Sequence, residues 1–217
     1  MTGREKFLIA IPMKDPSASK TRLSTCLSDQ ERQDLAFALF QRTLDVIEQA
    51  DCGCDILVVT ESARIEAVCA NRKTAVLREA QSAGLNAACE RAADWATDKG
   101  YSKLAILPAD LALLSPADLS TLASFPLEAG QLALCEATDG GTNCLFVSPP
   151  KVLQFHYGAN SFPAHRRQAM SHGLQCFLLR DTDMRFDIDR SEAPQIVRGR
   201  LPMGRECGRQ EGSVARG

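Results

Sequence analysis

The fold is decided by the stretch Phe7-Leu-Ile-Ala-Ile-Pro12-Met-Lys14-Asp-Pro-Ser-Ala-Ser-Lys20-Thr-Arg22-Leu23, in which an apolar run passes directly into a polar loop. The apolar residues 7–11 end at a proline, which is typical of a short strand buried on both faces. Such strands belong to sheets that helices cover on both sides. The loop that follows is therefore expected at the carboxyl edge of the sheet, where open α/β sheets bind their ligands.

The rest of the chain alternates between short apolar runs and segments with helical periodicity. Ser28 and Glu31 have the spacing of a capping box, which predicts that a helix begins there. Further strands are predicted at 55–60, 75–77, 103–107, 131–135, 144–147 and 175–179, and further helices up to residue 71, at 86–99, from 116 onward and at 161–172. This alternation predicts an α/β fold with a mainly parallel sheet between two helical layers.

The composition is that of a single globular domain. The chain has 217 residues, of which 45% are hydrophobic and 24% charged, and its formal net charge is -2. That charge argues against a general binder of nucleic acid or membrane surfaces, because both need a concentrated basic surface. No apolar run approaches the ~20 residues that cross a bilayer. We expect one domain at residues 1–200 and a disordered tail, rich in Gly and Arg, at 201–217.

The cysteines indicate a reducing compartment. There are nine, an odd number, and most lie in apolar stretches, as small buried hydrophobic residues do. Cys52 and Cys54 form the one close pair in the sequence, but neither a second pair nor a histidine follows at zinc spacing. Since no signal peptide is recognised, we expect a cytoplasmic protein.

Three cations lie in the loop after the first strand, namely Lys14, Lys20 and Arg22. Lysines and an arginine that converge on one loop suit a triphosphate, which needs charge neutralisation and bidentate donors. A solvated basic loop is the alternative, and the spacing does not decide between the two. Neither a Walker glycine–lysine pattern nor G-x-G-x-x-G is present, which removes the main support for a P-loop or a dinucleotide-binding fold.

Three aspartates are candidate metal ligands. Asp110 follows the predicted strand at 103–107 and stands between apolar residues, an unusual place for a charge that has no use. Asp187 and Asp189 alternate, so a strand would place both carboxylates on one side, about 6–7 Å apart. A Mg²⁺ ion that bridges phosphate oxygens takes one or two carboxylates. Turns and helix caps also use aspartates, and these alternatives stay open from spacing alone.

Two glycine-containing segments are candidates for binding a small anion. Thr142 follows a Gly-Gly pair in the first, and Gly158 and Ser161 lie in the second, where Ser161 stands at the start of a predicted helix. Glycine lets a ligand come close to the backbone, and the N–H groups at a helix start favour an anion. Ordinary turns would look the same. The three histidines have no metal-ligand spacing, and we interpret them as ordinary residues.

Together these segments resemble one family, the 2-phospho-L-lactate guanylyltransferases of deazaflavin coenzyme F420 biosynthesis, with its phosphoenolpyruvate and 3-phosphoglycerate variants. The six matching segments follow the family's order up to about residue 197, and they are Pro12-x-Lys14 with Ser19-Lys20-Thr-Arg22-Leu23, Gly84-Leu-Asn86-x-Ala88, Pro108-Ala-Asp110-Leu, Gly141-Thr142-Asn143, Gly158-x-x-Ser161-Phe with His165, and Asp187-Ile-Asp189. No single segment is specific, whereas six in the same order are hard to produce by chance.

The resemblance implies a three-layer α/β/α nucleotidyltransferase fold, Rossmann-like, with GTP as donor and Mg²⁺ as the metal. It implies transfer of GMP to the phosphate of a three-carbon phospho-acid, with release of pyrophosphate. It assigns the metal to Asp110, Asp187 and Asp189, the triphosphate to Lys14, Lys20 and Arg22, the neighbourhood of the nucleoside to Asn86, and the acceptor acid to Thr142, Gly158 and Ser161. The candidate catalytic residues are therefore Lys14, Lys20, Arg22 and Asp110.

Two departures from the family pattern are present. A leucine–alanine pair follows Asp110 where leucine–proline is usual, and His156 and Tyr157 precede Gly158 where an aromatic pair or Arg-Phe is usual. The second departure lies beside the expected acceptor site, so we count His156 among the acceptor-binding residues. The acceptors that we expect are 2-phospho-L-lactate or phosphoenolpyruvate. A histidine at this position could donate a hydrogen bond to an extra hydroxyl or to a displaced carboxylate, so 3-phosphoglycerate is the alternative acceptor.

Two other interpretations compete with this one. A sugar-phosphate or molybdopterin nucleotidyltransferase of the same fold should carry a glycine-rich loop after the first strand, which this chain lacks. A non-catalytic GTP-binding module should have lost its metal aspartates, and here all three are present. The sequence does not set the oligomeric state, so a homodimer stays open.

Overall fold

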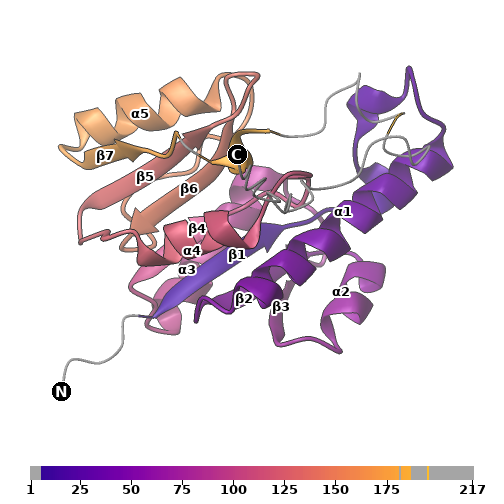
Figure 1. Ribbon diagram of the computed structural model, residues 1–217, viewed down its shortest axis with the longest axis horizontal. Helices are drawn as coiled ribbons and strands as arrows, with labels where there is room; N and C mark the ends of the chain where they lie inside the picture. Colours follow the sequence, from indigo (N-terminus) through magenta and orange to yellow (C-terminus); the bar gives the residue numbers. More distant parts are fainter. Residues whose placement is uncertain (1–5, 181, 187–194, 196–217) are drawn as a thin grey trace, which may run out of the picture.

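The computed structural model describes residues 6–180, 182–186 and 195, which build one sheet with helices around it (Figure 1). The strands are β1 (Phe7–Pro12), β2 (Asp55–Thr60), β3 (Thr74–Arg78), β4 (Lys103–Ile106), β5 (Gln131–Glu136), β6 (Thr142–Ser148) and β7 (Gln175–Leu178). Their order across the sheet is β3-β2-β1-β4-β6-β5-β7. Each strand predicted from the sequence is present, with ends that differ by one or two residues.

The sheet is mainly parallel, as predicted. β1 runs parallel to β2 and β4, β2 to β3, and β5 to β7. The exception is β6, which is antiparallel to both of its neighbours, β4 and β5. Residues 137–141 connect β5 to β6 directly, and a connection this short joins antiparallel strands, since a parallel crossover needs a dozen residues or more. The sequence analysis predicted both strands but not this reversal.

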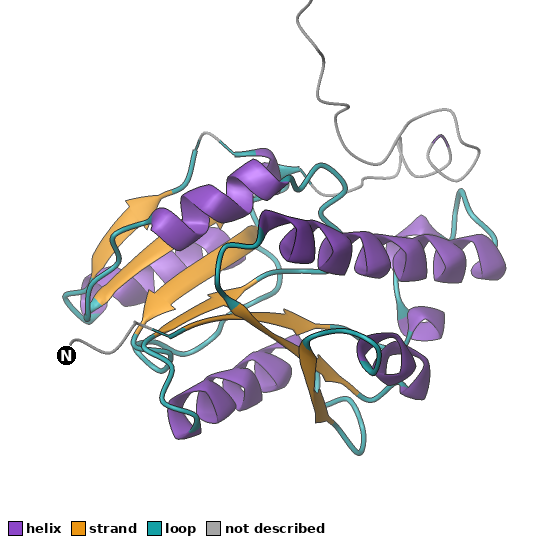
Figure 2. Ribbon diagram, turned by 60° about the horizontal axis from the view of Figure 1, so that its bottom comes forward, coloured by secondary structure: helices purple, strands orange, loops and turns teal. Residues whose placement is uncertain are grey.

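The helices form a layer on each face of the sheet (Figure 2). One face is covered by α1 (Asp29–Ala50), α2 (Ala63–Cys69) and α4 (Pro116–Ser124), and the other by α3 (Leu85–Asp98) and α5 (Ser161–Ser171). Side chains of one strand alternate between the two cores, so that Ile9 packs on the α1 side and Leu8 on the α3 side. This arrangement confirms the predicted three-layer, single-domain α/β/α fold.

The helix starts follow local sequence signals. In α1, the Ser28 hydroxyl accepts the N–H of Glu31, and the Glu31 carboxylate accepts the N–H of Ser28, which is the predicted capping box. Ser115 and Asp118 form the same reciprocal pair at the start of α4, the helix that the sequence analysis predicted from residue 116 onward. Both helices are thereby fixed at the ends that face the polar edge of the sheet.

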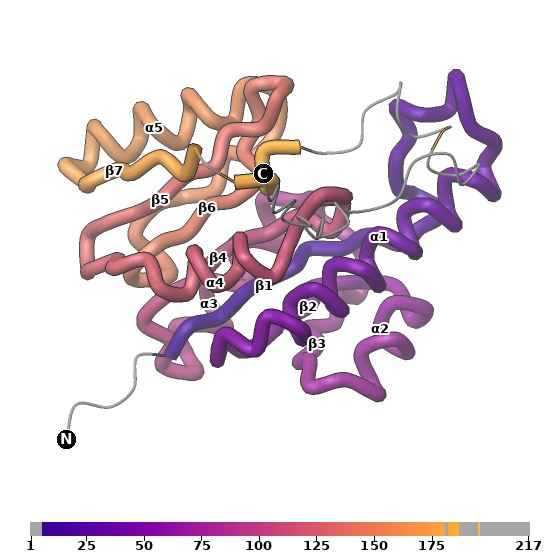
Figure 3. Tube along the Cα trace, viewed as in Figure 1, coloured from indigo at the N-terminus to yellow at the C-terminus, as the bar shows by residue number. Residues whose placement is uncertain are grey.

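The carboxyl ends of β1, β2, β3 and β4 meet at one edge of the sheet, and polar loops gather there. The loop after β1 extends beside the start of α1 (Figure 3). A small apolar cluster packs this loop onto α1 and onto the segment after β4, and it consists of Leu23, Leu27, Leu35, Leu39 and Ala112. Two loops that are far apart in the sequence therefore form one wall.

Among the helices that the structure describes, none combines the length and the apolar character that a bilayer span demands. The predicted tail at 201–217, and with it the domain boundary at residue 200, lies outside the described residues. The same holds for Asp187 and Asp189.

Candidate active site

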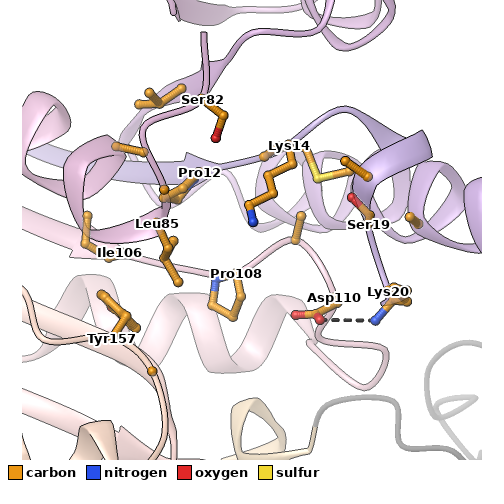
Figure 4. A pocket seen from close by; sticks show the side chains of 18 of the residues that line it. Pro12, Lys14, Ser19, Lys20, Ser82, Leu85, Ile106, Pro108, Asp110 and Tyr157 are labelled. Carbon is orange, nitrogen blue, oxygen red and sulfur yellow. Dashed lines mark hydrogen bonds and ion pairs between the residues drawn. The ribbon is translucent and has the colours of Figure 1, made fainter. Parts of the chain in front are cut away.

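A cleft of about 440 Å³ opens at the carboxyl edge of the sheet (Figure 4). Its walls come from the loops after β1, β2, β3 and β4, the start of β6, and the first turns of α3 and α5. The sequence-predicted site residues that line it are Lys14, Lys20, Arg22, Asp110, Thr142, Gly158 and Ser161. Residues separated by almost 150 positions in the chain thus share one cavity, whereas Asn86 and His156 lie outside its lining.

The three predicted cations are presented in two ways. Lys14 is exposed and its amine extends into the cleft (Figure 4), and Arg22 lies on the rim with 81% of its side chain exposed. Lys20 is held inside, with its side chain 9% exposed and its Nζ 3.1 Å from Oδ2 of Asp110. Its φ of 52° lies in the left-handed region, which residues with a side chain adopt only uncommonly. The cleft therefore has one fixed cation and two exposed ones.

The loop that carries these cations is shaped by other residues. The Asp15 carboxylate accepts the hydroxyl and the N–H of Ser17, at 2.6 and 3.0 Å, and also the hydroxyl of Ser62. These hydrogen bonds lower the pKa of Asp15. From α1, Nη1 of Arg32 donates to the carbonyl of Ser19 at 3.2 Å. The shape of the loop is thus set by Asp15 and Arg32, and the exposed Lys14 is not needed to hold it.

Asp110 lies in the turn after β4, and α1 holds that turn in place. Arg42 donates to two of the turn's backbone carbonyls, at 3.3 and 2.8 Å, and Thr43 donates to a third at 3.4 Å. The Asp110 side chain is 41% exposed and faces Lys20 (Figure 4). Since the N-cap of α4 is Ser115, Asp110 caps no helix. Its carboxylate pairs with Lys20 through Oδ2 and is exposed enough to meet a further cation in the cleft.

A second wall of the cleft is built from buried hydroxyl groups. Thr142 at the start of β6 and Ser161 in the first turn of α5 are 7% and 2% exposed, and their hydroxyl oxygens are 3.2 Å apart. Behind them His165 is fully buried, with Nδ1 3.0 Å from Oγ1 of Thr142 and Nε2 accepting the backbone N–H of His156 at 2.9 Å. Burial, followed by the nearby His156, lowers the pKa of His165 to about 4, so this ring is neutral near pH 7.

The loop at 156–158 is held by Asn86. The side-chain amide donates to the carbonyl of Tyr157 at 3.1 Å and accepts the N–H of the same residue at 2.7 Å. The nucleotide contact predicted for Asn86 would require these two hydrogen bonds to break. Gly158 has a φ of 137°, which side-chain-bearing residues rarely adopt, so its bare backbone lines the cleft. The structure therefore gives Asn86 the role of positioning this loop.

The structure corrects the expectation for His156. Its ring is exposed and does not line the cleft, whereas Tyr157 does. The space beside His165 is already taken, because the Tyr157 ring packs edge-on against it with centroids 5.1 Å apart. What His156 contributes to the wall is its backbone N–H, which bonds His165. Any selection of the acceptor by the His156 side chain loses its structural basis.

Comparison with known proteins identifies the family. The profile described as guanylyl transferase CofC like matches residues 7–196. The chain belongs to this family.

Individual relatives of this CofC-like protein span nearly its whole length. The 3-phospho-D-glycerate guanylyltransferase of Colwellia psychrerythraea is 36% identical over 189 residues, which are 87% of this chain and 90% of the relative. The phosphoenolpyruvate guanylyltransferase of Rubrobacter xylanophilus is 31% identical over 184 residues, 84% and 88% of the two chains. A nucleotidyl transferase structure from Methanothermobacter has a TM-score of 0.64 at 13% identity, covering 89% of this chain and 97% of the other. That likeness shows a shared fold.

Of the three aspartates expected to bind a metal in this CofC-like protein, Asp110 alone lies in the described part. Within that part, no three His, Cys, Asp or Glu side chains gather closely enough to hold a metal ion. The segment that precedes Asp187 is tied to the cleft, because Asn143 donates from Nδ2 to the carbonyl of Met184 at 2.9 Å. Asp118 also accepts the hydroxyl of Thr182 at 2.6 Å. The chain is thus anchored beside the cleft just before the predicted pair.

Sequence reasoning missed several residues of the site. Glu61 and Glu79 line the cleft directly after β2 and β3, the same strand-end position that drew attention to Asp110. Glu79 is buried and pairs with Arg91 at 3.2 Å. His165, which the sequence analysis took as ordinary, lies four residues after Ser161 and therefore on the same face of α5. Glu61 and Glu79 could have been found from their place just after a strand, and His165 from its place on the same helix face as Ser161.

Proposed function

We propose that this protein transfers GMP from GTP to the phosphate of a three-carbon phosphorylated acid and releases pyrophosphate, as a step in the biosynthesis of the deazaflavin coenzyme F420. The observation that carries the proposal is one cleft with two walls suited to anions, a cationic loop after β1 and a buried pair of hydroxyls at Thr142 and Ser161. Joining two polyanions requires such a pair of walls. The names of the relatives, which are guanylyltransferases for phosphorylated acids, support the same reaction.

In this reaction a phosphate oxygen of the acceptor attacks the α-phosphorus of GTP. The bond from that phosphorus to the oxygen of the β-phosphate breaks, and pyrophosphate leaves with the electron pair. The attacking oxygen is already an anion, so no side chain has to remove a proton. The chain must instead position two groups that repel each other and supply positive charge. Lys20, fixed at 3.1 Å from Asp110, supplies an oriented charge, and the exposed Lys14 and Arg22 supply adaptable ones.

We further propose that the activity requires Mg²⁺, held by Asp110 together with Asp187 and Asp189. The fit rests on Asp110, whose carboxylate lines the cleft, is 41% exposed and caps no helix. A bound Mg²⁺ ion would add positive charge at the phosphate oxygens, which carboxylate-bound magnesium does in phosphoryl-transfer sites.

The acceptor that we propose first is 3-phospho-D-glycerate, followed by phosphoenolpyruvate and 2-phospho-L-lactate. The relative named for 3-phospho-D-glycerate is 36% identical to this chain, and the relative named for phosphoenolpyruvate is 31% identical. The hydroxyl wall also suits an acid with an additional polar group, because a site that hydrogen-bonds such a group rejects analogues without it.

Guanine is the base that the acidic side of the cleft suits. Glu61 and Glu79 line the cavity at the ends of β2 and β3. Carboxylates accept hydrogen bonds and donate none when ionised, which matches the N1–H and N2–H groups of guanine, and adenine has no such pair of donors. Glu79 is buried and already pairs with Arg91, whereas Glu61 is partly exposed, so Glu61 is the carboxylate that supports GTP as the donor.

A cytoplasmic location is part of the proposal. The eight cysteines in the described residues are free thiols, which fits a reducing compartment. GTP and a small phosphorylated acid are the partners that we expect. The net charge of -2 argues against nucleic acid as a partner, because binding its phosphates needs positive charge.

Purified protein tests the proposal when it is incubated with GTP, Mg²⁺ and each of the three acids in turn, while pyrophosphate release is followed. We expect release with at least one acid, none when the acid is omitted, and none in excess chelator. Equal use of all four nucleoside triphosphates would contradict the assignment of the donor. Thermal stabilisation by GTP without pyrophosphate release, whichever acid is added, would identify a non-catalytic binding module instead.

A further inference from the structure

The hydrogen bonds around His165 determine which of its two ring nitrogens carries the proton. Nε2 lies 2.9 Å from the backbone N–H of His156, and a nitrogen that accepts an N–H cannot itself be protonated. The ring is fully buried and neutral, so its single proton is on Nδ1. The backbone of one loop thereby selects the tautomer of a side chain on α5.

This tautomer sets the direction of the Thr142 hydroxyl. Nδ1–H of His165 donates to Oγ1 of Thr142 at 3.0 Å, and the hydroxyl of Ser161 donates to the same oxygen at 3.2 Å. Both lone pairs of that oxygen are then used, and what it still offers is its own proton. With the opposite tautomer, Nδ1 would accept the Thr142 proton, and the hydroxyl would face away from the cleft.

We propose that His165 is a positioning residue that makes Thr142 a donor-only hydroxyl, directed at a carboxylate or phosphate oxygen of the acceptor acid. The inference rests on the proposed function, since it names the part of the cleft that holds the acceptor. A group that can only donate favours an anionic oxygen, and hydrogen bonds to charged groups are the stronger ones.

The arrangement extends one step further from the cleft. Asn86 bonds both the N–H and the carbonyl of Tyr157, next to the peptide group that donates to His165. The side chains of Asn86, His165 and Thr142 therefore form one sequence of contacts, from the start of α3 to the acceptor wall. Each contact is a hydrogen bond between residues that are distant in the chain or buried.

The tautomer can be measured directly on the full-length protein without any substrate. A long-range ¹H–¹⁵N correlation spectrum of ¹⁵N-labelled protein distinguishes protonated from unprotonated ring nitrogens, and the His165 signals are identified by their loss in His165→Phe. We expect a protonated Nδ1 and an unprotonated Nε2. A protonated Nε2, or a ring that averages between the two forms, would overturn the inference whatever the enzyme's activity.

Kinetics test the consequence for the acceptor. His165→Phe should raise the KM for the acceptor acid about 10- to 100-fold, the range expected for one hydrogen bond to a charged group, and leave the KM for GTP unchanged. His165→Asn should recover most of the loss, because its amide N–H takes the place of Nδ1–H. His172→Asn, at an exposed histidine on the end of α5, is the matched control and should behave as wild type.

Three results would count against the role of His165. They are equal changes in both KM values, no rescue by asparagine, or a normal acceptor KM in a well-folded His165→Phe protein. Failure of the proposed function is distinguishable from these, because wild type would then turn over none of the three acids while the NMR spectrum still reports the tautomer.

Discussion

The two walls of the cleft, which we propose to bind anions, differ in their physical character. The cationic loop offers Lys14 and Arg22, which are exposed. Their positive charges attract an anion over several ångströms, and salt screens this attraction. The hydroxyl wall offers Thr142 and Ser161, which are almost fully buried. His165 bonds the Thr142 hydroxyl, and the Ser161 hydroxyl donates to that same oxygen. Charge tolerates small displacements, whereas a hydrogen bond weakens steeply when its angle changes. Binding of GTP should therefore be sensitive to salt, and binding of the acceptor sensitive to mutation.

Asp110 lines the same cleft beside Lys20, and its replacement should have the largest effect. Asp110→Asn should lower kcat about 1000-fold, because it removes a carboxylate that we assign to the metal, a contribution of several kcal/mol. The melting temperature should change little, since asparagine keeps a side-chain oxygen that can accept from Lys20, and the Asp110 side chain is 41% exposed and caps no helix. Steady-state kinetics and a thermal melt of each variant check this. Asp98→Asn, at an exposed aspartate of α3, is the control, and an Asp110→Asn enzyme with more than a tenth of wild-type kcat would refute the assignment.

The hydroxyl wall should also leave a signature in stability against pH. The pKa of His165 falls from 6.5 to about 4 on folding, so the unfolded chain binds more protons than the native one between these values. The stabilisation is present in full above pH 6.5 and is lost as the pH falls toward 4, by about 3 kcal/mol. Urea unfolding at both pH values should show this loss in wild type. In His165→Asn the loss should be smaller by a similar amount, and identical slopes would contradict a buried neutral histidine.

Substitutions of Thr142 test whether the hydroxyl itself, and not only the shape of the side chain, is needed to bind the acceptor. Thr142→Val keeps the shape but removes the hydroxyl, and should raise the acceptor KM about 10- to 100-fold while the KM for GTP stays the same. It should also destabilise the fold by about 1–3 kcal/mol, because Nδ1–H of His165 loses its buried partner. Thr142→Ser restores the hydroxyl and should be close to wild type. A valine variant with a normal acceptor KM would show that the acceptor binds elsewhere.

The smallest effect is expected in the cationic loop. Lys14→Ala should raise the KM for GTP about five- to tenfold at low salt, because one exposed charge near the triphosphate is lost. The difference from wild type should shrink in 0.5 M KCl, where exposed charges are screened. The acceptor KM and the melting temperature should not change. A salt-independent defect would indicate that Lys14 acts through an oriented contact, like the opposite wall.

Sequence alone predicted the fold and the set of segments that meet at the site. The reason is physical: carboxyl ends of parallel strands share one edge of the sheet, so a polar residue such as Lys14 or Asp110 just after a buried strand must lie there. Capping residues at Ser28 and Ser115 likewise mark helix starts from local chemistry. The reversed strand β6 was missed because attention went to strand composition and not to the short connection before it.

The contacts inside the hydroxyl wall were beyond sequence reasoning. Asn86 and Tyr157 are 71 residues apart. No spacing rule predicts that the side-chain amide of Asn86 bonds both the backbone N–H and the carbonyl of Tyr157. These two hydrogen bonds hold the backbone that carries His156 and Tyr157. The sequence analysis expected the His156 side chain in the cleft, whereas Tyr157 lines it. His165 gained its role from burial behind Thr142, and burial of a helix residue depends on the neighbouring strand.

The identity of the product tests the account most directly. Wild-type protein is incubated with GTP, Mg²⁺ and 3-phospho-D-glycerate until GTP is consumed, and the mixture is analysed by ³¹P NMR and mass spectrometry. We expect a guanosine diphosphate diester in which two coupled phosphorus atoms join GMP to the acid, formed in equal amount to pyrophosphate. GMP or GDP without incorporation of this acid, or of the other two acids offered in parallel, would contradict the claim that the cleft joins two anions.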